Sequence, residues 1–236
     1  MRHWVDSGLE RIGALLLPPR CVLCGGRGQP PCLDLCRDCE ADLPPARPAI
    51  LSDHGPLRMS FAPYGYAPPL DHLVHALKYR GQLAVARVLG NLLGAQVESL
   101  GLQHDVDVLV PVPLHVARHA ERGFNQSLEI ARWTARRLGG RVEARLVQRR
   151  RDTRPQVGLG SAERRTNLAD AFAAVAPVRR LRVALVDDVT TTGTTLQELG
   201  TVLLEAGASS VVAWCVGRAA AAKQVNYRFD MEDPSA

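Results

Sequence analysis

The second half of the chain alternates short apolar runs with longer stretches in which apolar residues recur at helical spacing. Apolar runs predict strands over 107–113, 142–148, 169–175, 182–188 and 209–217, of which 169–175 has the weakest signal. Helical spacing predicts helices over 125–138 and 194–207, and Asn125 is the expected N-cap of the first. Strands that alternate with helices predict a parallel sheet covered by helices on both faces.

The first half of the chain has a less regular pattern. Apolar residues at helical spacing predict an amphipathic helix over 3–17, which Pro18 and Pro19 end. The remaining expected elements are a linker over 44–50, a short strand over 58–66, helices over 70–79 and 82–99 that are broken at Gly81, and a tail from Gly217.

Composition limits the size of the fold and says little about partners. The chain has 236 residues, 46% of them hydrophobic, which is enough for one sizeable core and an appendage. Its net charge is +5, and only Lys78 and Lys223 are lysines among 29 basic residues. The arginine excess fits either the codons of a GC-rich genome or a surface that binds phosphates. The modest, unclustered charge favours the codon explanation.

The sequence shows no signal for export or membrane insertion. Asp6, Glu10 and Arg11 interrupt the first 17 residues, so the apolar centre of a signal peptide is missing. No stretch reaches the roughly 18 apolar residues of a membrane span. We therefore expect a cytoplasmic protein, in which reduced cysteines favour metal binding over disulfides.

Four cysteines form two closely spaced pairs. Cys21 and Cys24, and then Cys36 and Cys39, each enclose two residues, and 11 residues separate the pairs. Four thiolates in this arrangement are typical of a structural Zn²⁺ site. Cys32 could replace one of the four ligands. The alternatives are buried small apolar residues and, less favoured, a redox pair.

Residues 183–199 read VALVDDVTTTGTTLQEL. An apolar run meets two aspartates, and five threonines and Gly193 precede a helical pattern. A helix N-terminus with hydroxyls can hold a phosphate, while Asp187 and Asp188 suit a neighbouring diol, so together they describe a ribose 5-phosphate. The alternative is an ordinary strand–turn–helix corner. A nucleotide P-loop is excluded because the Gly-Lys-Ser/Thr ending is missing.

This stretch resembles the phosphoribosyl pyrophosphate (PRPP) motif of type I phosphoribosyltransferases. The wider pattern resembles the ComF (ComFC/GntX-like) family through CVLC, LCRDC, HALKYRG, VLVPVPLH, RGFNQSLEIA and RDTRPQVGL, which lie within residues 21–216. The resemblance implies an α/β fold: a type I phosphoribosyltransferase-like parallel sheet flanked by helices, with a small N-terminal zinc-ribbon segment. The chain is also similar to the transferase half of amidophosphoribosyltransferases, but it has no matching glutaminase half.

The resemblance assigns a role to each part of the site. Asp187 and Asp188 would hold the ribose hydroxyls of PRPP, and the threonine turn would hold its 5-phosphate. The implied PRPP-binding residues are Asp187, Asp188, Val189, Thr190, Thr191, Thr192, Gly193, Thr194 and Thr195. The segment PVPLH would face pyrophosphate through Val112, Pro113 and Leu114. The arginine-rich segment 149–168 would be a mobile lid, or else a solvated surface loop.

Transfer from PRPP would require Mg²⁺ and cations over the departing pyrophosphate. The candidate catalytic cations are Arg118, Arg122 and Arg165, with Arg154, Arg164 and Lys78 as further candidates. Each could equally be a surface charge. We expect no side chain to act as nucleophile or general base. His115 and His119 lie beside the pyrophosphate-facing segment, where capping or solvation is favoured over ligand contact.

Two functions follow from these patterns. One is a PRPP-binding, Mg²⁺-dependent phosphoribosyltransferase, a glycosyltransferase with an unknown acceptor. The other is a non-catalytic zinc-ribbon adaptor or PRPP sensor in competence or DNA metabolism, with a DNA-uptake helicase or single-stranded DNA as partner. In both cases we expect an N-terminal helix and zinc ribbon over 1–47, a phosphoribosyltransferase-like domain over 48–217 and a tail over 218–236.

Overall fold

The computed structural model describes residues 19–29, 34–46, 55–150 and 171–219. Their centre is a sheet of strand order β1-β7-β6-β3, with β2 also paired to β7. The strands are β1 (Met59–Phe61), β2 (Tyr64–Gly65), β3 (Val108–Pro111), β6 (Arg182–Thr190) and β7 (Ser210–Arg218). Every pairing is parallel, so the carboxyl ends of the strands lie along one edge of the sheet.

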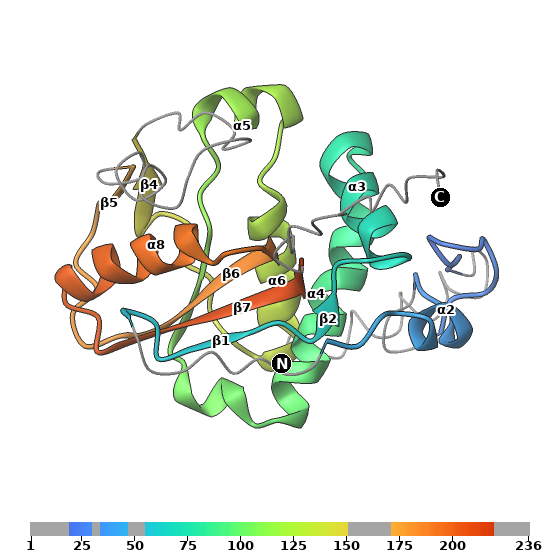
Figure 1. Cartoon of the computed structure of the whole chain (residues 1–236), viewed down its shortest axis with the longest axis horizontal. Coiled ribbons are helices and arrows are strands. Elements are labelled where there is room, and N and C mark those ends of the chain that lie inside the picture. The colour runs from blue at the N-terminus through green and yellow to red at the C-terminus, as the bar shows by residue number, and fades with distance from the viewer. Residues whose placement is uncertain (1–18, 30–33, 47–54, 151–170, 220–236) are drawn as a thin grey trace, which may run out of the picture.

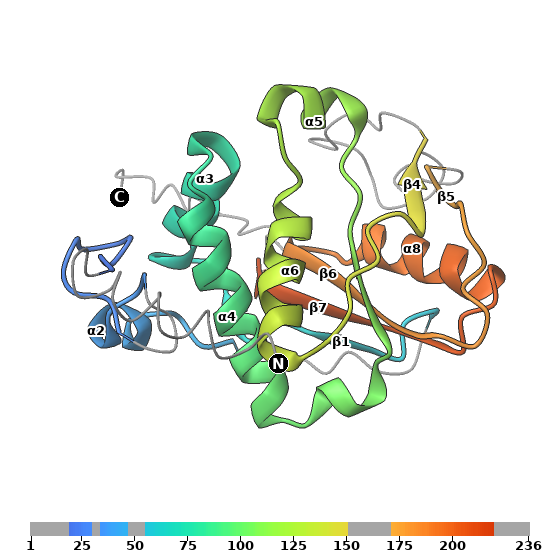
Figure 2. The same cartoon turned by 180° about the vertical axis from the view of Figure 1, so that it is seen from behind.

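Helices cover both faces of this sheet (Figures 1 and 2). α8 (Thr194–Glu205) lies on one face, and α4 (Leu83–Ser99) and α6 (Gln126–Leu138) lie on the other. The side chains of β7 alternate accordingly: Trp214 belongs to the core cluster of α4 and α6, whereas Cys215 belongs to that of α8. Burial on both faces explains the nearly continuous apolar runs of the central strands.

The contact between α4 and α6 is close. A Cβ on Gly90 would lie 2.5 Å from the Cβ of Trp133 and 2.7 Å from the carbonyl oxygen of Ile130. The hydroxyl of Thr134 donates a hydrogen bond to the Gly90 carbonyl at 3.1 Å. α6 also contacts β3 and β6, so this packing sets where the N-terminus of α6 lies against the sheet.

The other helices lie around this core. α3 (Leu70–Arg80) precedes α4 and ends at Gly81, whose φ of 62° is left-handed, as the sequence pattern predicted. α5 (Val116–Arg122) follows β3, and the 3₁₀ helix η1 (Leu102–Asp105) follows α4. α2 (Arg37–Ala41) lies in the cysteine segment, beside α3 and α4 and on the side of the molecule away from α8 (Figure 1).

The segment 142–148 is not a strand of the main sheet, so that prediction was wrong. Only Val142 bridges to Leu109, and β4 (Val147–Arg149) pairs antiparallel with β5 (Phe172–Ala174) in a separate two-stranded sheet. The physical reason is the shortness of the apolar run. Arg145 is exposed and only Leu146 and Val147 are buried, which cannot fill a strand covered on both faces.

Other element boundaries also differ from the predictions. The strand expected over 58–66 is divided into β1 and β2, the strand expected over 107–113 ends at Pro111, and β6 continues to Thr190. α5 was not predicted because it has no buried residue and therefore no apolar periodicity.

The predicted fold class is confirmed: a parallel sheet flanked by helices, with a small N-terminal cysteine segment. The domain boundaries remain a prediction. The helix predicted over 3–17, Cys32, residues 151–168 of the predicted lid and the tail from residue 220 lie outside the described residues. Within the described ranges, no helix has the length and apolar character needed to cross a bilayer.

Candidate functional site

The four predicted cysteine ligands come together at the N-terminus. The sulfur atoms of Cys21, Cys24, Cys36 and Cys39 all lie within 4.8 Å of one another. The Sγ atoms of Cys24 and Cys36 are 3.6 Å apart. A tetrahedral zinc site with bonds of about 2.3 Å has ligand separations of about 3.8 Å, so the four thiols can hold a metal ion such as zinc.

Local backbone structure positions both cysteine pairs. The amide of Cys21 donates to the carbonyl of Gly26 at 2.7 Å, and Gly25 takes a left-handed φ of 74°, which forms the first tight turn. Cys36 is the N-cap of α2 and accepts a hydrogen bond from the amide of Cys39. Each pair therefore presents its two sulfurs from one turn of the chain.

The thiols of the cluster differ in acidity. Burial opposes ionisation of Cys21, but backbone hydrogen bonds from Cys24, Cys36 and Leu23 outweigh it and lower its pKa to about 6. Burial and the neighbouring thiols raise the pKa of Cys39 well above its ordinary value. Because thiolates are the ligands that bind zinc, a metal ion would have to displace the proton of Cys39.

An ion pair connects the cysteine segment to the core. Asp34, two residues before Cys36, accepts hydrogen bonds from Arg87 of α4 at 2.5 and 2.7 Å. The Arg87 guanidinium also lies over the ring of Trp133 in α6, 5.6 Å from its centroid. Leu35 is fully buried in the same core cluster as these helices. The predicted zinc segment therefore packs directly on the α4–α6 face.

Asp187 and Asp188 lie on β6 where that strand extends beyond its neighbour. The pairing of β3 with β6 ends at Pro111 and Val186, while β6 continues to Thr190. The two aspartates therefore lie within the strand, and not at its end as the apolar run over 182–188 predicts. Because β3 stops before the two aspartates, β3 does not pair with β6 beside them, and other elements can contact their side chains there.

Side chains from α6 and α3 hold the two carboxyl groups. The hydroxyl of Ser127 donates to Asp187 Oδ1 at 2.7 Å, and the amide of Gln126 donates to Asp188 Oδ1 at 3.3 Å. Lys78 of α3 forms an ion pair with Asp188 Oδ2. Of these three partners, only Lys78 had been a candidate from the sequence. Ser127 and Gln126 lie directly after the Asn125 N-cap, and this position was the only signal for them.

Burial controls the charge of this pair. Burial, followed by the charge of Asp188, raises the pKa of Asp187 to about 7. Burial opposes the charge of Lys78, but the adjacent Asp188 prevails and raises the pKa of the lysine. Near neutral pH the site therefore contains a lysine ion pair and a second carboxyl group that is close to its titration point.

The threonine turn leads directly into α8. Gly193 is the N-cap of α8 with a φ of 75°, and no side chain in the described part of the chain caps the helix. The first turn of α8 contains no acidic residue, and Thr191 and Thr192 are exposed. The hydroxyls of Thr192 and Thr194 are 2.8 Å apart. This arrangement leaves amide and hydroxyl donors at a helix N-terminus, which is chemistry that suits an anion.

The segment predicted to face pyrophosphate is anchored at Val112. Its amide donates to the Val186 carbonyl at 2.9 Å, and its carbonyl accepts from the Asn125 side chain at 3.0 Å. Pro113 and Leu114 are half-buried. His115 caps α5 by accepting a hydrogen bond from the amide of Ala117, which agrees with the favoured capping role.

The candidate cations occupy different places. Arg122 donates to Gln126 Oε1 at 3.1 Å, and its guanidinium lies 5.3 Å from the centroid of the Tyr79 ring. Gln126 in turn bonds Asp188, so Arg122 is connected to that carboxylate through one side chain. Arg118 is exposed on α5. Arg154, Arg164 and Arg165 lie outside the described residues.

Comparison with known proteins assigns the chain to a family. It is 37% identical over 195 residues to the DNA utilization protein YhgH of Salmonella typhimurium, covering 79% of this chain and 85% of the relative. It is 34% identical over 160 residues to competence protein F of Haemophilus influenzae, covering 65% of this chain and 70% of the relative. The chain belongs to the ComF family. No protein-family model matches this ComF-family chain.

A solved structure resembles this ComF-family protein more distantly. The glutamine PRPP amidotransferase of B. subtilis, complexed with ADP and GMP, is 26% identical to it, with a TM-score of 0.39. The likeness covers 56% of this chain and 26% of the amidotransferase. A TM-score of that size adds nothing to the family assignment.

Proposed function

We propose that this ComF-family protein binds PRPP at the carboxyl edge of its sheet and acts as a Mg²⁺-dependent phosphoribosyltransferase. The observation that carries the proposal is the pair of half-buried Asp187 and buried Asp188, held by Ser127, Gln126 and Lys78. This pair lies shortly before the N-terminus of α8, which no side chain caps within the described ranges. Acceptors for a diol and donors for a phosphate, in that order along the chain, match the two polar groups of a phosphorylated ribose.

The proposed binding mode gives each group one role. The ribose hydroxyls of PRPP would donate to the two carboxylates, and the 5-phosphate would accept from the amides and hydroxyls of the threonine turn. Pyrophosphate would leave past Val112 towards α5, where Arg118 and Arg122 carry positive charge. Mg²⁺ would arrive bound to the pyrophosphate oxygens of the substrate and neutralise their charge. The attacking group would belong to the acceptor.

A second candidate function is a PRPP sensor or adaptor in DNA uptake or DNA metabolism. The names of its relatives, DNA utilization protein and competence protein, favour it. A DNA-uptake helicase or single-stranded DNA would then be the partner. In that case the pocket would bind PRPP without turnover.

PRPP binding is tested by calorimetric titration with PRPP and Mg²⁺. Asp188→Asn keeps the shape of the side chain but removes its charge, and we expect PRPP to bind at least about tenfold more weakly, as for a lost charged hydrogen bond. Asp105→Asn is the matched control, because Asp105 is an exposed carboxylate in η1. Equal PRPP affinity in the two variants would contradict the assignment of the ribose site.

Turnover separates the two candidate functions, and Arg165 in the predicted lid is the residue to test. A transferase should lose pyrophosphate release in Arg165→Ala while its PRPP affinity stays nearly constant, because a contact made only in the transition state affects rate. A sensor should show no pyrophosphate release with any acceptor, and the variant should weaken PRPP binding. Unchanged turnover and affinity would leave Arg165 as a surface charge.

A further inference from the structure

The chain leaves the sheet after Val112 and returns at Asn125, the N-cap of α6. None of the intervening residues 113–124 is buried, and Figures 1 and 2 show α5 standing away from the sheet. This excursion includes Pro113 and Leu114, which the sequence predicts to face pyrophosphate. Their position relative to the two aspartates therefore depends on how the base of the excursion is fixed.

One side chain closes that base. The Asn125 side-chain amide donates to the Val112 carbonyl at 3.0 Å, and its own oxygen accepts from the backbone amides of Ser127 at 2.9 Å and Leu128 at 3.4 Å. Asn125 thus caps α6 and also holds the first residue after β3. The partners fix the orientation of the amide, because the reversed group would place oxygen against oxygen and N–H against N–H.

These bonds belong to a closed circuit that includes the aspartate pair. The Val112 amide donates to the carbonyl of Val186 at 2.9 Å, and Val186 directly precedes Asp187. Asp187 Oδ1 accepts from the Ser127 hydroxyl at 2.7 Å, and the Ser127 amide donates back to Asn125. The circuit joins the segment predicted to face pyrophosphate to a carboxyl group of the proposed ribose site.

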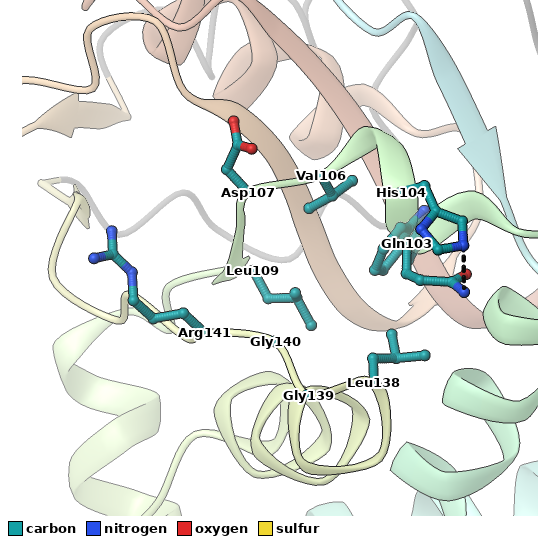
Figure 3. Close-up of a pocket in the computed structure, with 10 residues that line it drawn as sticks. Gln103, His104, Val106, Asp107, Leu109, Leu138, Gly139, Gly140 and Arg141 are labelled. Atoms are coloured by element: carbon teal, nitrogen blue, oxygen red, sulfur yellow. Dashed lines mark hydrogen bonds between the residues drawn. The ribbon is translucent and has the colours of Figure 1, made fainter.

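The amino end of β3 is held differently, beside a pocket of about 470 Å³ (Figure 3). There Asp107 accepts from the Arg182 backbone amide at 2.9 Å and from the Arg182 guanidinium at 2.7 Å. Charge-assisted hydrogen bonds, which are stronger than neutral ones, fix this end of β3 to the first residue of β6. The loss of the Asn125 side chain should therefore be felt at the carboxyl end of β3.

Asparagine suits this position better than the other residues that cap helices well. Aspartate accepts from helix amides but has no donor for a carbonyl oxygen. The serine hydroxyl is one bond closer to the backbone, so it can cap the helix without reaching Val112. A position that only capped α6 would accept either residue, whereas the contact with Val112 requires the asparagine amide.

We propose that Asn125 is a positioning residue, which holds the pyrophosphate-facing segment in a fixed place relative to the ribose site. This inference rests on the proposed function, because it takes PRPP as the ligand. PRPP would contact both ends of the site, whereas ribose 5-phosphate lacks pyrophosphate and would contact only the aspartates and the threonine turn. Loosening of Val112 should therefore weaken PRPP binding and spare ribose 5-phosphate.

Asn125→Ser keeps a neutral cap and removes the bond to Val112. In calorimetric titrations of the full chain with Mg²⁺, we expect it to bind PRPP about fivefold more weakly than the wild type does, as for one neutral hydrogen bond, and ribose 5-phosphate with an affinity within about twofold. Asn91→Ser is the matched control, because Asn91 donates to the Arg87 carbonyl within α4 at 2.9 Å, and it should preserve both affinities. An equal loss for both ligands in Asn125→Ser, or no loss for either, would overturn the proposal.

Hydrogen exchange of the ligand-free protein, followed by NMR, tests the contact independently of the proposed function. We expect the Val112 amide to exchange about fivefold faster in Asn125→Ser and in Asn125→Asp, while the amides of Ser127 and Leu128 keep their wild-type rates. Asn125→Asp is used only here, because its charge would itself repel pyrophosphate.

An unchanged exchange rate at Val112 would overturn the proposal and leave Asn125 as a helix cap. Absence of PRPP binding in the wild type would overturn the proposed function, while a faster Val112 amide in the two variants would still support the connection between Val112 and α6.

Discussion

At the scale of single residues, the charge of Asp187 depends strongly on its surroundings. It is half-buried beside the buried Asp188, and its carboxyl group accepts hydrogen bonds from the Ser127 hydroxyl and the Asp188 amide. Burial and the neighbouring charge together hold its pKa at about 7, against 3.8 in an unperturbed chain. The site thus favours a proton on Asp187 when no ligand is bound, and PRPP hydroxyls would favour its release.

This shift predicts a pH-dependent effect of Asp187→Asn on stability. Between about pH 4 and pH 7 the folded state keeps a proton that the unfolded state has lost, so the contribution of Asp187 to stability is complete at low pH and is lost as the pH rises through 7. The asparagine variant cannot ionise, and we expect it to raise Tm relative to the wild type by at least about 2 °C more at pH 8 than at pH 5.

The measurement is thermal unfolding of both proteins at the two pH values, without ligand. Asp105→Asn is the control, because that side chain is 59% exposed and should give the same small offset at both pH values. A Tm difference between Asp187→Asn and the wild type that does not change with pH would show that Asp187 is already ionised at pH 5.

At the scale of elements, α6 connects the two candidate sites. Its first residues, Gln126 and Ser127, bond the carboxyl pair, and its Trp133 lies under the Arg87 guanidinium that pairs with Asp34 of the cysteine segment. The close approach at Gly90 keeps α6 against α4, the helix that carries Arg87. The position of α6 therefore depends on how tightly these two helices pack.

Two glycines of α4 test this packing. Gly90→Ala places a Cβ 2.5 Å from the Trp133 Cβ and 2.7 Å from a backbone carbonyl, so we expect about 1–3 kcal/mol loss in the free energy of unfolding. Gly94→Ala, one turn later, comes nearest to the Cδ of the Arg137 side chain at 2.9 Å, which can move, and the helix preference of alanine offsets the cost. Urea unfolding measures both, and equal stability of the two variants would contradict the close α4–α6 contact.

For the whole molecule, the cysteine cluster and the parallel sheet share one core. Leu35, directly before Cys36, is 1% exposed among residues of α3, α4 and α6, so the cysteine segment packs on the same core as these helices. The buried Asp34 carboxylate requires Arg87 as its counter-ion, since an unpaired buried charge is costly. Loss of a metal ion from the cluster would therefore disturb this face of the α4–α6 pair.

We expect the purified protein to contain about one zinc ion, because four thiolates form a closed tetrahedral site. Cys39→Ser removes one ligand and should abolish the bound zinc and lower Tm, since metal binding and folding are coupled in such segments. Cys215→Ser is the control: Cys215 is fully buried in β7, far from the cluster along the chain, and its variant should retain the metal. Elemental analysis of protein purified without chelators measures the zinc content. Equal zinc content in the Cys39→Ser and Cys215→Ser variants would refute the assignment of the four cysteines as ligands.

Local sequence was sufficient to predict the class of the fold and to single out both candidate sites. Apolar periodicity depends on whether a segment is buried on one face or two, so the central strands, α6 and α8 could be predicted from neighbouring residues alone. The cysteine pairs and the run VDDVTTTGTT are likewise short-range patterns, in which all the relevant groups lie within a few residues of one another. The weaker signal over 142–148 failed because pairing partners, and not periodicity, decide where a short strand goes.

Only the tertiary structure decided which distant residues meet. Gln126 reaches Asp188 across 62 positions of sequence, and Lys78 reaches the same carboxylate from a different helix. Gln103 and Trp214 border one pocket although neither lies in a recognisable motif. Such contacts depend on strand order and on the packing distance between helices, both of which are set by the whole core. No local pattern of residues encodes them, because the same periodicity is compatible with many arrangements of the elements.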